Sequence, residues 1–236
     1  MINSYIGIDL ETTGLNPKLD KVIEIGAIKV VEGKKVDTFS TFVNPGRRLE
    51  ERIIALTGIT QAQVDGAQEI EQILPKLMTF LEDLPLLGHR ILFDYSFLKK
   101  AAVNQRLSFE KQGIDTLRIA RVFLPELEHR TLEYLCRHFQ IPHTAHRATA
   151  DAEATSQLYQ ILAEQYYEQD SKIFEPQVLN YSVKKDTPAT KAQKERLYRL
   201  VELHRLQPDY NIERLTRSEA SRYTDLILAQ YGRLSQ

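Results

Sequence analysis

The sequence predicts an α/β layered domain built on a mixed β-sheet and followed by a small C-terminal helical segment. Two patterns support this fold class. Three apolar, β-branched stretches follow one another within the first 43 residues and are separated by turn residues. Beyond them, amphipathic helical periodicity alternates with short apolar runs. Strands in meander order, followed by alternating helices and strands, are typical of a mixed sheet flanked by helices.

The first three elements are expected to be strands. The first is expected at Tyr5–Asp9, the second at Lys21–Val31 and the third at Lys35–Val43. Gly33 marks the hairpin turn between the second and third. The third strand ends before Asn44-Pro45-Gly46 because proline cannot donate a hydrogen bond into the ladder.

Helices and short strands follow. Thr60 can cap a helix that begins at Gln61. Apolar spacing and short apolar runs predict a helix at Ile70–Leu81, a strand at Pro85–Gly88, a helix at Phe93–Val103, a strand ending at Gly113–Thr116, and helices at Leu117–Phe123, Thr131–Phe139 and Ala148–Tyr167.

The domain boundaries follow from the loss of this periodicity. No period holds from Gln169 to Asp186, where Pro176 and Asn180 interrupt the pattern, so residues 169–186 are expected to form a linker. We therefore expect one domain at residues 1–168 and a small helical module at residues 187–236.

Composition excludes several classes of protein. The 236 residues are 42% hydrophobic and 27% charged, and 31 basic against 32 acidic residues leave a net charge of −1, which is not that of a polycation seeking nucleic acid. The single cysteine, Cys136, suits a reducing compartment. The N-terminal residues MINSYIGID do not resemble a signal peptide, and no apolar run is long enough for a membrane helix. A cytoplasmic protein without a membrane partner is expected.

Four acidic residues are expected on inward faces. Asp9 and Glu11 lie two apart on a strand and point the same way. Asp94 and Asp151 each share a helix face with apolar residues. Taken singly, each has an ordinary alternative, as a solvated strand end or as an acid near a helix start, where the dipole favours it. Together, without matching inward Lys or Arg, they indicate shared divalent cations, and carboxylates suit Mg²⁺ or Mn²⁺ better than zinc.

His146 lies five residues before Asp151 and just outside the predicted helix. An imidazole there can lean over the acids and take a proton from water. A lone histidine is more often structural, and this is the interpretation we give to His129, His138, His143 and His204.

Three segments resemble the motifs of the DEDDh 3′→5′ exonucleases, a group in the RNase T-like superfamily that includes the proofreading subunits of bacterial replicative polymerases. They are DLETTGL (9–15), GHRILFDYSFL (88–98) and HRATADA (146–152). IALTGIT (54–60) and GIDTLRIARVFLPEL (113–127) are similar to the DNA polymerase III epsilon/PolC type of exonuclease domain. The resemblance covers roughly residues 4–167.

The resemblance implies a ribonuclease H-like fold and release of nucleoside 5′-monophosphates from a 3′ end. It implies two Mg²⁺ (or Mn²⁺) ions on Asp9, Glu11, Asp94 and Asp151, and His146 as the general base. It also implies a seat for the terminal nucleotide made by Thr12, Thr13, Leu15, Thr57 and Phe93. Arg90 stands where the family often has asparagine, and its guanidinium suits a substrate phosphate.

The helical module has nine basic and six acidic residues in Thr187–Gln236, a net charge of +3, which leaves −4 for residues 1–186. This excess predicts contact with the nucleic-acid backbone upstream of the 3′ end. The alternatives are a solvated helical hairpin, a protein-binding segment or a cover for an apolar face.

The leading hypothesis is an exonuclease for DNA, preferably single-stranded, working in repair or with a polymerase or clamp as partner. The alternatives are an exoribonuclease or oligonucleotide scavenger, and a catalytically silent binding module. The four acids and His146 disfavour the silent module, because a pure binder does not need them. Sequence alone does not separate DNA from RNA substrates.

Overall fold

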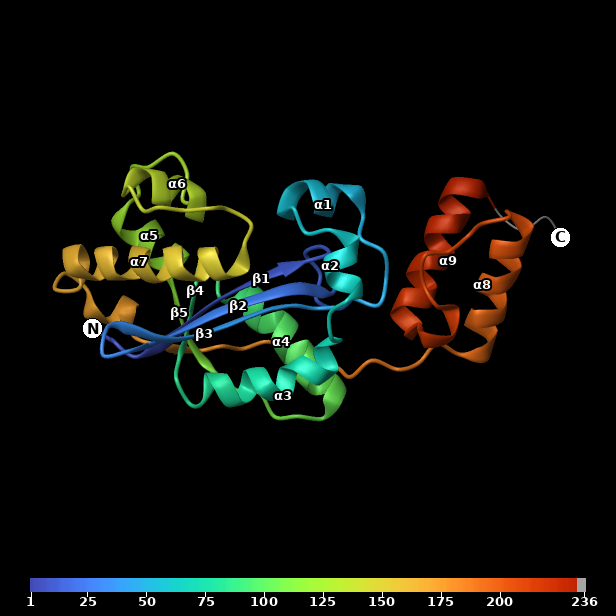
Figure 1. Cartoon of the computed structure of the whole chain (residues 1–236), viewed down its shortest axis with the longest axis horizontal. Coiled ribbons are helices and arrows are strands. Elements are labelled where there is room, and N and C mark those ends of the chain that lie inside the picture. Colours follow the sequence, from blue (N-terminus) through green and yellow to red (C-terminus); the bar gives the residue numbers. More distant parts are fainter. Residues whose placement is uncertain (233–236) are drawn as a thin grey trace.

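A computed structural model describes residues 1–232 and contains a six-stranded mixed sheet with helices on both faces (Figure 1). The strand order is β3-β2-β1-β4-β5-β6. β1, β2 and β3 pair antiparallel, β4 and β5 continue parallel to β1, and β6 closes the edge antiparallel. The strands are β1 (Tyr5–Thr12), β2 (Val22–Val31), β3 (Lys34–Phe42), β4 (Leu86–Gly88), β5 (Gln112–Asp115) and β6 (Gln177–Val178). The predicted α/β class with a mixed sheet is confirmed.

The helices form one layer on each face of the sheet (Figure 1). α3 (Ile70–Leu81) and α4 (Leu92–Gln105) pack their buried residues on one face. α5 (Thr116–Phe123), α6 (Leu132–His138) and α7 (Ala148–Tyr166) cover the other face. Each layer therefore has its own apolar core against the sheet.

The two-residue period of β1 decides which side chains meet which layer. Ile6, Ile8 and Leu10 belong to the core shared with α3 and α4. The residues between them point to the opposite face, where α7 comes so close that a Cβ on Gly7 would lie 3.2 Å from the Ala152 carbonyl oxygen. Asp9 and Glu11 share this second face, so the strand directs both carboxylates toward α7.

Two elements in the first 65 residues differ from the sequence prediction. β1 continues through Thr12 and pairs with the start of β2 across an irregularity at Glu11/Thr12. α1 (Glu51–Thr57) was not expected, because seven residues without a side-chain cap leave too short a pattern. It precedes α2 (Gln61–Asp65), whose predicted cap at Thr60 is present as a capping box.

The first half of the predicted linker at residues 169–186 is instead packed on the domain. It contains a 3₁₀ helix at Ser171–Phe174 and strand β6, which pairs with β5. The Phe174 and Leu179 side chains are buried in the two cores of the sheet. These elements have two to four residues each, too short for any periodicity to reveal them.

Residues 187–232 form a helical unit beyond the end of the sheet where α1 and α2 lie (Figure 1), and we call this unit the C-terminal module. It comprises α8 (Lys191–Leu203), a 3₁₀ helix at Ile212–Arg214 and α9 (Arg217–Tyr231). Its buried apolar residues cluster separately from those of the sheet. The division into a domain at residues 1–168 and a module at residues 187–236 stays a prediction, and residues 171–179 pack with the sheet and not with the module. Within residues 1–232, every helix is too short or too polar to cross a membrane.

Gly26 on β2 is the point where α7 touches the sheet. A Cβ built there would lie 2.1 Å from the Thr149 nitrogen and 2.2 Å from the Ala148 carbonyl carbon. Both are backbone atoms at the start of α7, so they cannot move aside without moving the helix. Only glycine allows this approach.

Gly26→Ala is therefore expected to destabilise the protein by about 2–3 kcal/mol, the upper range for overpacking in a core. Urea unfolding of both proteins measures the change. Gly66→Ala is the matched control, because the nearest atom to its added Cβ is 3.7 Å away and its φ is −81°. Equal losses in the two variants would contradict the importance of this contact.

Candidate active site

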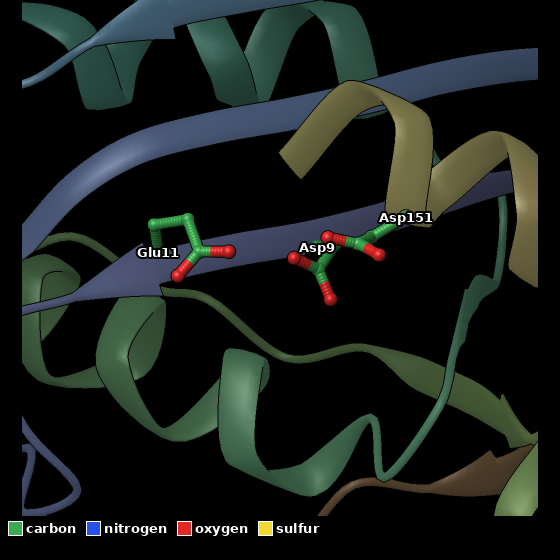
Figure 2. A group of neighbouring side chains, drawn as sticks. All are labelled: Asp9, Glu11 and Asp151. Carbon is green, nitrogen blue, oxygen red and sulfur yellow. The ribbon is translucent and has the colours of Figure 1, made fainter. Parts of the chain in front are cut away.

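Three carboxylates from two elements meet at the face of β1 that α7 covers. Asp9 and Glu11 project from β1, and Asp151 reaches them from the first turn of α7 (Figure 2). One oxygen from each lies within 4.8 Å of the others. Three of the four acids expected to bind metal therefore share one small volume.

Glu24 fixes the start of α7 beside this cluster. It is the register partner of Glu11 on the neighbouring strand and is only 2% exposed. Its carboxylate accepts a hydrogen bond from the Ala148 backbone nitrogen at 3.3 Å and one from the Arg147 guanidinium at 3.0 Å. The sequence suggested no role for Glu24, although an acid inside an otherwise apolar strand was the available signal.

The fourth acid, Asp94, lies in the first turn of α4 and is 3% exposed. Its Oδ1 accepts a hydrogen bond from the Leu10 backbone nitrogen at 3.0 Å, which ties α4 to the middle of the Asp9–Glu11 segment. It is outside the group of three whose oxygens converge. Burial, together with Asp115 and Glu11, raises the pKa of Asp94 to about 8 despite the hydrogen bonds it accepts.

The neighbouring acids are also difficult to ionise. Burial raises the pKa of Asp9 well above its usual range, and the nearby carboxylates of Asp94, Asp151 and Glu11 add to the effect. Burial, Asp151 and Glu24 raise the pKa of Glu11 to about 7, although Arg147 opposes the rise. Such carboxylates ionise together only when positive charge is added.

The donor set fits hard divalent cations. Its ligand atoms are all carboxylate oxygens, the preferred donors of Mg²⁺ and Mn²⁺. The one cysteine, Cys136, is buried in the core under α5 to α7. The electrostatic strain among Asp9, Glu11 and Asp94 is the strain that such cations relieve.

Two histidines border the cluster. His146 Nδ1 lies 4.0 Å from Glu11 Oε1, and its side chain is about half exposed. Its φ of +63° is in the left-handed region and turns the chain sharply just before α7 begins. His143, which we expected to be structural, contacts Asp151 Oδ1 through Nε2 and is almost fully buried. Water can therefore reach His146 more readily than His143.

The five residues expected to seat a terminal nucleotide have different surroundings. Leu15 is 79% exposed just beyond β1, and Phe93 packs its ring against Phe97 at 5.1 Å. The Thr57 hydroxyl is buried and donates to the Ile53 carbonyl oxygen at 2.9 Å.

The two threonines after β1 have engaged hydroxyls. Thr12 donates to the Gly14 carbonyl oxygen at 2.7 Å, and the Thr13 hydroxyl accepts from the Arg47 guanidinium at 2.6 Å. The Thr13 backbone nitrogen also donates to the Lys21 carbonyl oxygen at 2.8 Å. The exposed Leu15 side chain remains available for contact with a ligand. Arg90, by comparison, has an exposed side chain, and its backbone nitrogen is bonded to Asp115.

The chain matches a family model described as "Exonuclease", RNase_T, over residues 6–159. It is 34% identical to the PolC-type DNA polymerase III of Oceanobacillus iheyensis over 241 residues, which is 96% of this chain and 17% of that protein. It is 39% identical to the PolC-type enzyme of Clostridium perfringens over 157 residues, 66% of this chain and 11% of that protein. The chain therefore spans only a small part of these relatives.

Solved structures share the fold. Exonuclease X in complex with 5′-overhanging duplex DNA superposes with a TM-score of 0.57 and 24% identity, covering 72% of this chain and 99% of that one. The nuclease domain of 3′hExo, a DEDDh family member bound to rAMP, gives 0.60 and 23%, covering 77% and 98%. E. coli exonuclease I with a dT13 oligonucleotide gives 0.65 and 20%, covering 73% and 44%. The sheet domain of this chain thus has the ribonuclease H-like fold of these exonucleases.

Asp94→Asn is expected to stabilise the metal-free protein, and more so at high pH. Because the pKa of Asp94 is raised from 3.8 to about 8 on folding, its contribution to stability is present below pH 4 and is lost as the pH rises through 8. Asparagine stays neutral and can still accept from Leu10. Thermal unfolding in EDTA should show a gain of about 1–3 kcal/mol at pH 8 and a smaller gain at pH 5.

Added Mn²⁺ should reverse the order, raising the midpoint of the parent protein more than that of the variant, because only the parent retains all four carboxylates. A gain that is the same at pH 5 and pH 8 would contradict the raised pKa of Asp94.

Proposed function

This chain belongs to the RNase T-type exonuclease family, and from that premise we propose that it removes nucleotides from the 3′ end of DNA, preferably single-stranded. The observation that supports this best is the meeting of Asp9, Glu11 and Asp151 oxygens within 4.8 Å, with His146 at the margin. This arrangement suits metal-assisted phosphodiester hydrolysis.

Asp9, Glu11, Asp94 and Asp151 would hold two Mg²⁺ or Mn²⁺ ions. Such ions, when bound, stabilise the charge on the attacking and leaving oxygens of an in-line displacement. Asp94 Oδ1 would keep its bond with the Leu10 backbone nitrogen, and its second carboxylate oxygen would take the ligand position. The buried position of these carboxylates fixes them before substrate arrives, which lowers the cost of ordering the site.

His146 would act as the general base. Its side chain is half exposed beside Glu11 and can face a water molecule at the open side of the cluster. The imidazole would take the proton from this water molecule and later return it to solvent. Glu24 and Arg147 hold the backbone on the C-terminal side of His146, so they would limit where the imidazole can point.

The terminal nucleotide would be seated by the backbone at Thr12 and Thr13 and by the Leu15 side chain. Phe93 and the α1 end at Thr57 would line the same seat from the other side. Leu15 is well suited to this role, because an exposed leucine next to a catalytic cluster can pack against a base or sugar.

We favour DNA as the substrate because exonuclease X and exonuclease I are seen with DNA, and because the two relatives named above are DNA polymerases. A polymerase or clamp partner is proposed on the same ground. The second candidate is an exoribonuclease or oligonucleotide scavenger, which the rAMP bound to 3′hExo favours. A cytoplasmic location fits a single, buried cysteine.

The first test is the substrate panel. The full chain and its Asp9→Asn variant would be incubated with end-labelled single-stranded DNA, RNA and mismatched duplex, with Mg²⁺, Mn²⁺ or EDTA. We expect ladders of shortening DNA from the parent with metal. Asp9→Asn should be inactive but folded, because it loses one metal ligand and keeps its volume. A folded Asp9→Asn variant that degrades DNA at the parental rate would refute the metal site.

The second test separates the two histidines. His146→Ala should slow hydrolysis by about two to four orders of magnitude, the usual scale for a general base, with Mn²⁺ affinity unchanged. His143→Ala is the matched control and should slow it less. Rates from single turnovers and Mn²⁺ calorimetry decide this. A larger loss for His143→Ala with metal affinity intact would transfer the base role to His143, and lost Mn²⁺ binding in His146→Ala would make His146 a ligand.

A further inference from the structure

The loop between β1 and β2 bears two of the residues proposed to seat the nucleotide, and it is folded around one carboxylate. Asp20 Oδ2 accepts a hydrogen bond from the Asn16 backbone nitrogen at 2.9 Å. A Cβ added to Gly14 would lie 2.5 Å from the same oxygen, so the loop backbone rests directly on the carboxylate. The Asp20 side chain is only 13% exposed. Asp20 therefore sets the conformation of residues 13–21, which we call the substrate loop.

Arg47 connects Asp20 to Thr13. Its Nη2 lies 3.5 Å from Asp20 Oδ1 and donates to the Thr13 hydroxyl at 2.6 Å and to the Leu19 carbonyl oxygen at 3.0 Å. Thr13 also pairs with Lys21 through its backbone nitrogen and its hydroxyl, at 2.8 and 3.0 Å. The two ends of the substrate loop are thus joined by one guanidinium and by backbone bonds.

The C-terminal module reaches the same residues. On α9, Arg222 Nη1 lies 3.6 Å from Asp20 Oδ1, on the same oxygen that Arg47 approaches. One helical turn earlier, Glu219 Oε1 lies 3.0 Å from Lys21 Nζ. Burial alone would raise the pKa of Glu219, but Lys21 and the bonds to Thr216 outweigh it and lower the pKa. Two neighbouring loop residues, acidic Asp20 and basic Lys21, are therefore paired with two residues of opposite charge on one side of α9, Arg222 and Glu219.

Further contacts hold the module at this position. Arg214 donates twice to the Glu69 carboxylate at 2.9 Å, and the backbones of Arg47 and Tyr210 form an isolated antiparallel bridge. The backbone of Arg47 therefore contacts the module, while its side chain binds the substrate loop.

The space between module and domain does not suit a phosphate chain. A cavity of about 390 Å³ lies there, lined by five basic and five acidic side chains. Such a balance gives no net attraction for polyanions. Arg214 and Arg222, two of the basic residues behind the module's +3 charge, are already paired with acids of the nuclease domain. These contacts favour a role for the module within the protein over the binding of a nucleic-acid strand at this face.

We propose that the C-terminal module positions the nucleotide seat: Arg222 and Glu219 act through Asp20, Lys21 and Arg47 to hold Thr13 and the rest of the substrate loop. They are positioning residues, since neither touches the carboxylate cluster. The proposal rests on the proposed function. It implies that the module controls the affinity for the 3′-terminal nucleotide itself, whatever the length of the strand.

The test uses the full chain and a thymidine dinucleotide, a substrate without the long upstream strand that phosphate contacts with the module would need. Arg222→Glu should raise KM for the dinucleotide roughly two- to fivefold, the scale on which partly exposed ion pairs act, while kcat changes little. Arg222→Lys should restore most of the affinity. Arg217→Glu is the matched control, because Arg217 is exposed at the start of the same helix and the charge change is identical.

An unchanged KM in Arg222→Glu would overturn the proposal. So would a loss confined to long strands and shared with Arg217→Glu, because that pattern indicates phosphate contact by the module. Hydrogen exchange in EDTA, without substrate, supplies a readout that does not depend on activity. Residues 13–21 should exchange faster in Arg222→Glu and at the parental rate in Arg217→Glu. If the parent protein cleaves nothing, the proposed function fails, and the exchange rates still decide whether the module holds the loop.

Discussion

The structure depends on one close contact, the placing of the first turn of α7 on strand β2. Gly26 makes it sterically possible, because any side chain there would overlap the helix backbone. Glu24, two residues earlier and on the same face, makes it directional, since its carboxylate bonds the first backbone nitrogen of α7 and the Arg147 guanidinium. Gly26 is also the register partner of Asp9. The strand that receives the helix thus lies next to the strand that carries the acids, and Asp151 arrives at Asp9 as a consequence.

This contact concentrates negative charge in a place that burial makes unfavourable for it. The pKa values of Asp9, Glu11 and Asp94 are all raised, first by burial and then by one another. A protein selected for stability alone would gain by replacing such acids with neutral residues. The apolar layers on both faces of the sheet supply the stability that offsets this cost. The same crowding suits divalent cations, because oxygens of Asp9, Glu11 and Asp151 already lie within 4.8 Å of one another.

The C-terminal module contacts the loop after β1 through charged side chains. Loops of eight or nine residues between strands are usually mobile, yet the loop after β1 is held by a partly buried carboxylate with one arginine from each part of the chain. A residue far away in sequence can in this way set the geometry next to the carboxylates. In our proposal the module therefore acts on the active site, although its own core is separate.

Much of this molecule was determined by local sequence. Alternation in β1 placed Asp9 and Glu11 on one face, and the long elements were predicted within a few residues, because periodicity of ten or more residues leaves little freedom. The motifs also indicated the family, because residue types and spacing agree over three segments. Tertiary structure alone decided the rest. It decided that Glu24 would anchor α7, that His143 would contact Asp151, that residues 171–179 would complete the sheet, and that Asp20 would join two arginines. Each of these contacts depends on partners that only folding brings together. Isolated residues and segments of two to four residues show no periodicity in the sequence, so their partners cannot be predicted from it.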